Sequence, residues 1–177
     1  MTILIFEADR NTIGQVKKGG SSFPVHSKLV LHAEQGRISH TTVDVPAYTK
    51  QYGAEEFEPN SYLDHPGRVI LFAYVNEELA GQIRLQKWWN GYAYIDDLAV
   101  EEGYRRQGVG RKLMESAITW AKTKGLPGIM LETQNNNVPA CRLYESCGFQ
   151  LCGFDTHLYK ALDPDTDEIA LYWYLMF

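Results

Sequence analysis

The strongest constraint on the fold is a strand, a glycine-containing turn, a helix and a second strand, which follow one another between residues 92 and 133. Residues 92–100 and 128–133 are apolar runs typical of strands. Between them, four apolar residues recur at spacings of four, four and three, which places them on one face of a helix: Val109, Leu113, Ala117 and Trp120. A strand, a crossover helix and a returning strand predict a parallel strand pair.

The segments on either side of this unit predict a largely antiparallel sheet. Residues 69–75, 79–89 and 92–100 form three strand candidates, and Asn90-Gly91 is a strong hairpin signal between the last two. Further strands are expected at 2–6, 149–159 and 168–177, and a second helix from Asn137 or Val138 to Gly148. Residues 11–60 mix helical and polar stretches, punctuated by three prolines, and predict no clear element. The expected class is therefore α/β (α+β), with a mixed, mainly antiparallel sheet, one β-α-β crossover and flanking helices.

Length and charge restrict the type of protein. A chain of 177 residues suits one domain, 1–177, with a core of its own. The net charge of −5 disfavours a nucleic-acid partner. An acidic protein can attract a cationic small molecule, although such a charge more commonly serves solubility.

The cysteines and the apolar runs bear on the compartment. Cys141, Cys147 and Cys152 show no CxxC spacing, so neither a disulfide framework nor a metal site is expected, and reduced thiols fit a cytoplasmic protein. The first ten residues do not resemble a signal peptide, and the late apolar run 169–177 is too short for a membrane-spanning helix. A membrane partner is not expected. The sequence does not give the oligomeric state, and a homodimer is one option.

The turn before the predicted helix carries the clearest chemistry. Gly108 and Gly110 let backbone amides approach a ligand, and a helix start is a good seat for phosphate. Arg105 and Arg106 add positive charge. The pattern is neither GxxxxGK[ST] nor GxGxxG after a first strand, which disfavours P-loop and Rossmann sites. The alternative is a plain helix cap with two solvated arginines.

Two segments together resemble the GNAT family of N-acetyltransferases. Arg105-Arg106-Gln107-Gly108-Val109-Gly110, after a strand ending Asp97-Leu98-Ala99-Val100, is similar to the family's first cofactor segment, and residues 137–149 resemble its second. The resemblance covers roughly residues 69–160. It implies acetyl-CoA as cosubstrate and the following cofactor-binding residues: Leu98, Ala99, Val100, Arg105, Arg106, Gln107, Gly108, Val109, Gly110, Arg111 and Asn137.

Within that family the chain is most similar to the streptothricin acetyltransferases. Residues 94–100, 131–137, 152–155 and 167–174 carry this likeness. It implies acetylation of an amine on the β-lysine moiety of a cationic antibiotic, which confers resistance. Two alternatives remain open: an N-acetyltransferase for a protein N-terminus or a polyamine, and a non-catalytic acetyl-CoA-binding sensor.

Three residues are candidates for catalysis. Asp97, on the strand that leads into the cofactor turn, and Glu132, on the strand after the helix, are candidate bases for the ammonium proton. The resemblance implies that Tyr144 is a general acid, or a hydrogen-bond donor, to the leaving thiolate. A structural carboxylate and a core tyrosine are the alternatives. Strand alternation predicts that Asp96 and Asp97 point to opposite faces.

The remaining expectations concern the oxyanion and the acceptor. The resemblance implies a backbone N–H near Leu98 or Ala99, released by a strand bulge, as the oxyanion donor. Asn137 is expected to bind the pantetheine arm, to cap its helix, or both. Cys141 is disfavoured as a nucleophile because no suitable histidine is evident nearby, so no acetyl-enzyme is expected. Aromatic residues at 88–94 and acidic clusters at 55–58 and 163–168 could line an acceptor pocket, but packing and a solvated surface are the commoner reasons.

Overall fold

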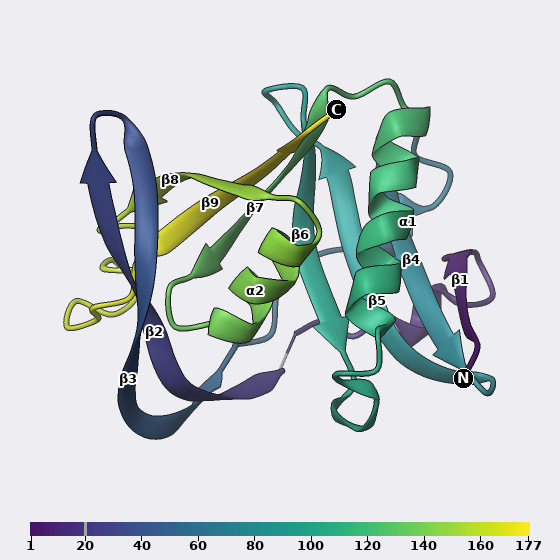
Figure 1. Cartoon of the computed structure of the whole chain (residues 1–177). Helices are drawn as coiled ribbons and strands as arrows, with labels where there is room; N and C mark the ends of the chain where they lie inside the picture. Colours follow the sequence, from purple (N-terminus) through teal and green to yellow (C-terminus); the bar gives the residue numbers. More distant parts are fainter. Residues whose placement is uncertain (20) are drawn as a thin grey trace. The chain divides into compact units, whose positions relative to one another are not determined.

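The computed structural model describes residues 1–19 and 21–177, and its contacts divide the chain into two compact units. Unit 1 contains residues 1–20, 53–129 and 176–177, and unit 2 contains residues 21–52 and 130–175. Each unit therefore combines segments that are far apart in the sequence (Figure 1). The expectation of a single domain over 1–177 stays a prediction. In the described part of the chain, no helix has the length and apolar character needed to cross a membrane.

The strands of unit 1 form an antiparallel array in the order β1-β4-β5-β6. These strands are β1 (Ile3–Glu7), β4 (Arg68–Val75), β5 (Glu78–Lys87) and β6 (Ala93–Val100). The turn between β5 and β6 contains Gly91 at φ +91°, a left-handed conformation that suits glycine. The predicted meander is confirmed, with boundaries shifted by at most two residues.

Helix α1 (Val109–Thr123) packs on this array and covers β4 and β5 (Figure 1). Its buried face consists of Val109, Leu113, Met114, Ala117 and Ala121, while Trp120 remains partly exposed. Among the described residues of unit 1 there are also three short 3-10 helices: η1 (Ile13–Gln15), η2 (Pro59–Tyr62) and η3 (Glu102–Tyr104).

Unit 2 is dominated by a long hairpin that the sequence did not predict. Strands β2 (Ser22–Glu34) and β3 (Arg37–Gln51) pair antiparallel on either side of a tight turn (Figure 1). Gln35 and Gly36 occupy that turn with φ +49° and +76°, as a type I′ hairpin turn requires. Pro24 and Pro46, which were expected to interrupt regular structure, instead lie inside the two strands. Proline is tolerated in strands at sheet edges and bulges.

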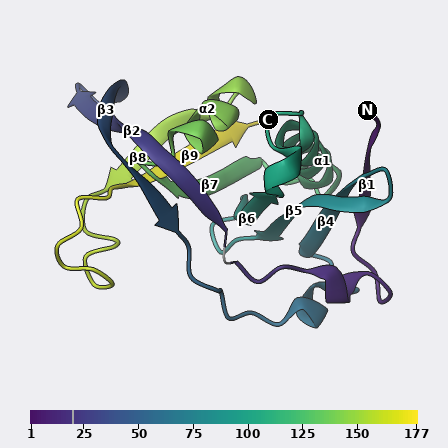
Figure 2. The ribbon, with the colours of Figure 1, turned by 90° about the horizontal axis from the view of Figure 1, so that it is seen from below.

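The rest of unit 2 contains most of β7 (Gly128–Gln134), helix α2 (Val138–Ser146), β8 (Gln150–Asp155) and β9 (Ala170–Met176). These strands lie in the order β7-β9-β8, and β8 and β9 are antiparallel. The predicted strand 149–159 ends early, at Asp155. Its Oδ1 accepts hydrogen bonds from the amides of His157 (2.7 Å) and Leu158 (3.1 Å), which turns the chain. Figure 2 shows the long connection that follows as a loop extending beyond the strand ends.

Candidate active site

The turn that follows β6 has the geometry of an anion site. Arg106 (φ +62°) and Gly108 (φ +90°) are left-handed, and Gly108 is the N-cap of α1. Such turns gather backbone amides into a concave surface beside a helix N-terminus, where a partial positive charge favours anions. Arg105 Nε donates to the carbonyl oxygen of Val100 (3.1 Å), and Gln107 Nε2 donates to that of Gly103 (2.7 Å). These two hydrogen bonds hold the turn in place. These residues fit the pyrophosphate of a coenzyme.

A strand irregularity sets the direction of the two neighbouring aspartates. In the β5–β6 register, Asp97 faces Arg84 and Ile95 faces Leu85, so Asp96 is an extra residue on β6. This is a β-bulge, which restarts the alternation of side chains. The implied bulge therefore exists in β6, at Asp96, two residues before Leu98. The oxyanion donor near Leu98 or Ala99 stays a prediction.

Because of this bulge, both aspartates lie on one face of the strand. Gln82 Nε2 donates to Asp97 Oδ2 (2.8 Å), and Gln86 Nε2 donates to Asp96 Oδ1 (2.9 Å). Gln82 and Gln86 are four residues apart on β5 and so share a face. The prediction that Asp96 and Asp97 point to opposite faces is wrong, since it assumed an unbroken alternation.

Arg84 is the cation at the centre of this cluster, and its exposed fraction is only 6%. Its guanidinium donates to the Tyr62 hydroxyl (3.3 Å), is paired with Glu55, and lies 3.9 Å from the centroid of the Phe57 ring. Tyr62 in turn donates to Asp96 Oδ2 (3.4 Å). The Glu55 carboxylate is thus paired with the guanidinium directly, and that of Asp96 is linked to it through Tyr62. The third carboxylate, that of Asp97, lies opposite Arg84 in the strand register.

Burial is the main influence on the two aspartates. It raises the pKa of Asp96 and of Asp97, while the glutamine hydrogen bonds and Arg84 lower it in part. An excess of carboxylate in such surroundings favours a cationic partner. An open hollow of about 540 Å³ lies next to Glu55 and is lined by Lys18 and residues 54–58.

Arg84 and its glutamine neighbours were not among the residues expected from the sequence. A signal was present, because Gln82, Arg84 and Gln86 form an alternating polar row within an otherwise apolar strand. Such a row indicates a polar face that is nevertheless covered by other residues.

The aromatic residues of the β5–β6 hairpin pack against each other. The rings of Trp88 and Tyr94 stack with centroids 4.8 Å apart. Trp89 is 86% exposed and lies outside this stack. Cross-strand packing, the commoner reason for aromatic residues in a hairpin, therefore accounts for Trp88 and Tyr94.

In unit 2, Glu132 on β7 is a carboxyl group with a shifted pKa. Burial raises the pKa of Glu132 to about 7. The Tyr159 hydroxyl, from the connection between β8 and β9, donates a hydrogen bond to its Oε1. A carboxyl group with a pKa near the working pH is well suited to accept and release a proton.

The second predicted cofactor segment forms α2 in unit 2. Asn137 Oδ1 accepts from the Ala140 amide (3.3 Å), so the predicted helix cap is confirmed. Its Nδ2 also donates to the Tyr52 hydroxyl (3.3 Å). Tyr144 is 7% exposed, and its ring centroid lies 6.1 Å from that of Phe149 and 6.2 Å from that of Trp173.

Cys141, on the same helix, is poorly suited to nucleophilic attack. Burial raises the pKa of its thiol to about 12, so the thiolate is scarce at neutral pH. This supports the expectation that no covalent acetyl-enzyme forms. Of the predicted site residues, Asp97 and the turn after β6 belong to unit 1, whereas Glu132, Asn137 and Tyr144 belong to unit 2.

Comparison with known proteins identifies the family. The profile of the Acetyltransferase (GNAT) family matches residues 38–149. The chain belongs to this family. The match begins earlier than residue 69, where the resemblance in sequence was expected to start, and so includes much of β3 and the residues that lead to β4.

The chain is also similar to individual proteins over most of its length. It is 36% identical over 161 residues to streptothricin acetyltransferase A of Bacillus subtilis (strain 168), covering 90% of this chain and 92% of that protein. It is 46% identical over 152 residues to a streptothricin acetyltransferase of Escherichia coli, covering 86% and 84%. A crystal structure assigned as a streptothricin acetyltransferase of Bacillus anthracis, in complex with acetyl coenzyme A, superposes with a TM-score of 0.89 at 44% identity, covering 100% and 98%.

These comparisons confirm the fold class and the type of enzyme. The protein has the GNAT fold, a mixed α+β architecture with a mostly antiparallel central sheet and two helices. It is an acyltransferase whose cosubstrate is acetyl-CoA.

Proposed function

We propose that this GNAT enzyme acetylates an amine on the β-lysine moiety of streptothricin and thereby confers resistance to the antibiotic. The observation that carries the proposal is the identity of 36–46% to streptothricin acetyltransferases over 86–90% of the chain. The excess of carboxylates around Arg84 supports it, because the acceptor is cationic.

In this proposal the turn after β6 and the start of α1 hold the coenzyme. Bound acetyl-CoA supplies the thioester that the amine attacks directly. The left-handed turn at Arg106 and Gly108 presents amides to the pyrophosphate, and the arginines add charge. The binding residues proposed are Leu98, Ala99, Val100, Arg105, Arg106, Gln107, Gly108, Val109, Gly110, Arg111 and Asn137.

Deprotonation of the acceptor is the first chemical requirement. A lysine-like ammonium has a pKa of ~10.4, so its neutral form costs about 4–5 kcal/mol at pH 7. Of the two proposed bases, Glu132 has the better matched pKa, about 7. Asp97, with Asp96 and Glu55 around Arg84, then serves mainly to attract the cation.

Tyr144 is the proposed donor to the leaving thiolate. A phenol has a pKa of ~10 and a thiol ~8.5, so full proton transfer is uphill by about 2 kcal/mol. A hydrogen bond that stabilises the thiolate, followed by proton exchange, meets this requirement. The packing of its ring by Phe149 and Trp173 limits the directions in which the hydroxyl can point.

The test is the release of CoA thiol from acetyl-CoA with streptothricin as acceptor, beside the variants Tyr144→Phe, Glu132→Gln and Asp97→Asn. We expect rapid release by the native enzyme and a 10²–10⁴-fold lower kcat for a variant that has lost an acid or base. Calorimetric binding of acetyl-CoA by each variant controls for loss of the cosubstrate. Release with spermidine or an N-terminal peptide, but not with streptothricin, would refute the substrate and leave the acetyltransferase activity intact.

A further inference from the structure

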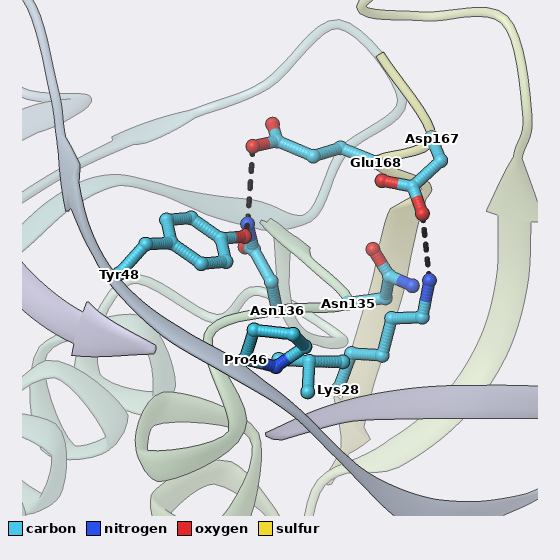
Figure 3. A pocket seen from close by; sticks show the side chains of 8 residues that line it. Lys28, Pro46, Tyr48, Asn135, Asn136, Asp167 and Glu168 are labelled. Atoms are coloured by element: carbon cyan, nitrogen blue, oxygen red, sulfur yellow. Dashed lines mark hydrogen bonds and ion pairs between the residues drawn. The ribbon is translucent and has the colours of Figure 1, made fainter. Parts of the chain in front are cut away.

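A second cavity, about 360 Å³ in volume, lies within unit 2 (Figure 3). Its walls come from β2, from β3, from the residues after β7 and from those before β9. The lining residues are Lys28, Val45, Pro46, Tyr48, Asn135, Asn136, Asp167 and Glu168. None of them belongs to the catalytic or cofactor-binding residues proposed above.

The wall from β3 is shaped by an irregularity in the hairpin. Val25 pairs with Tyr48 and Ser27 pairs with Asp44, so three residues of β3 oppose the single residue His26 of β2. Val45 and Pro46 are two of those three. An irregularity of this kind redirects side chains that regular pairing would place elsewhere, and here two apolar ones line the cavity.

Asn135 fixes the walls to one another. Its carbonyl oxygen accepts from the Leu29 amide (2.8 Å) and its Nδ2 donates to the Leu29 carbonyl oxygen (3.1 Å). Its amide donates to the Ile169 carbonyl oxygen (3.0 Å), and its Oδ1 accepts from the Ile169 amide (3.0 Å). Backbone and side-chain groups of Asn135 are thus occupied in joining β2 to the segment before β9, which makes the cavity a preorganised one.

Asn136 contributes an acceptor whose capacity is unused. The residue is 4% exposed, and its Nδ2 donates to the Tyr48 hydroxyl (2.9 Å) and to Glu168 Oε1 (3.0 Å). The Glu168 carboxylate requires a donor, which fixes the orientation of the amide. Asn136 Oδ1 is buried and has no hydrogen-bond partner among the described residues. Buried acceptors of this kind are normally satisfied, so this atom points to a donor supplied by a ligand.

The charges around the cavity balance. Lys28 Nζ pairs with Asp167 Oδ2 and Lys50 Nζ pairs with Glu168 Oε1, both at 2.6 Å. Two cations and two anions leave no net charge to select an ionic ligand. Val45, Pro46 and the Tyr48 ring offer apolar surface beside polar amides and a hydroxyl. A neutral ring that carries O–H or N–H donors matches both properties.

We propose that this cavity is a subsite for a neutral, hydroxylated or amide-bearing ring of the acceptor, at a distance from the reacting amine. An O–H or N–H group of the ring donates to Asn136 Oδ1, and the ring stacks on Tyr48 and Pro46. The inference rests on the proposed function in one respect, because it requires an acceptor that carries such a ring in addition to the reacting amine. Its role is to bind and orient, not to take part in the chemistry.

The kinetic test compares Asn136→Ala and Tyr48→Phe with the exposed control Thr49→Ala, which neighbours Tyr48 on β3 outside the cavity. With streptothricin we expect Kd and KM about tenfold higher for Asn136→Ala. We expect values about threefold higher for Tyr48→Phe, which keeps the ring but removes the hydroxyl that accepts from Asn136 Nδ2 and helps to fix that amide. Values for acetyl-CoA, for free β-lysine as a minimal acceptor, and for Thr49→Ala should match the native enzyme. Melting curves identify any loss of folding in Asn136→Ala, and Tyr48→Phe remains decisive if that variant is unstable.

A direct binding test separates this proposal from the proposed function. The side-chain amide NMR signals of Asn136 are followed during titration with streptothricin and, independently, with methyl glucopyranoside as a simple neutral ring. We expect both compounds to shift these signals. Acetylation of streptothricin without a shift at Asn136, or an equal loss of activity on free β-lysine in the variants, overturns the subsite. A shift with the glucoside in an enzyme that ignores streptothricin supports the subsite and refutes the antibiotic as acceptor.

Discussion

Replacement of Glu132 by glutamine should stabilise the protein in alkaline but not in acidic solution. The pKa of Glu132 is raised from 4.5 to about 7 because the ionised side chain is buried. Between those two pH values the unfolded chain loses the proton while the folded protein keeps it, so native stability falls as pH rises through this window. The cost is complete above pH 7 and amounts to about 3 kcal/mol.

Glutamine resembles the protonated carboxyl group, because it is neutral and its Oε1 can still accept from Tyr159. We therefore expect Glu132→Gln to match the native free energy of unfolding at pH 4.5 and to exceed it by about 3 kcal/mol at pH 8.5, equivalent to about 6–12 °C in Tm. Urea unfolding at both pH values, with the exposed Glu34→Gln as control, measures the difference. An equal effect at the two pH values, or a less stable variant at pH 8.5, would show that burial does not govern this carboxyl group.

Three further predictions concern glycines and thiols. Gly108→Ala should lower the free energy of unfolding by about 1–2 kcal/mol, because alanine disfavours φ +90°, and should weaken calorimetric acetyl-CoA binding; unchanged binding would remove the turn from the cofactor site. Gly81→Ala places a Cβ 2.7 Å from the Ala99 carbonyl oxygen, so urea unfolding should show a loss of about 1–3 kcal/mol, and a neutral result would contradict the tight packing. The exposed Cys152 should react with a disulfide reagent in the native protein, whereas the buried Cys141 should react only after unfolding; labelling and mass spectrometry of the two peptides would reveal the reverse order.

Local sequence signals predicted the turn after β6 and the two helices well. The glycine at 108 needs a left-handed conformation that few other residues adopt, and the apolar spacing after it specifies one face of α1. Asn137 caps α2 through the amide three residues later. Interactions over three or four residues are present in the sequence as spacing, so they can be inferred without a tertiary structure.

The β2–β3 hairpin shows where local signals fail. Its prolines and polar residues are more typical of loops than of strands. Strand propensity is weak evidence for a hairpin with an exposed face, because it depends on the packing around each residue. Gln35-Gly36 forms a common type of two-residue hairpin turn, but glutamine is not one of the residues that usually occupy its first position, so no hairpin signal was evident there in the sequence. The cavity lined by Asn136 depends on this hairpin and therefore could not be foreseen either.

The candidate catalytic residues Asp97, Glu132 and Tyr144 were proposed from motifs in the sequence. The directions of their side chains and their ionisation required the folded protein. The bulge at Asp96 places the side chains of Asp96 and Asp97 on one face of β6. Arg84 pairs with Glu55, which lies 29 residues away in the sequence. Tyr159 reaches Glu132 across 27 residues, and burial moves the pKa of that carboxyl group to about 7. Register and burial are properties of packed strands, and the free energies that fix them arise only when distant segments exclude water together.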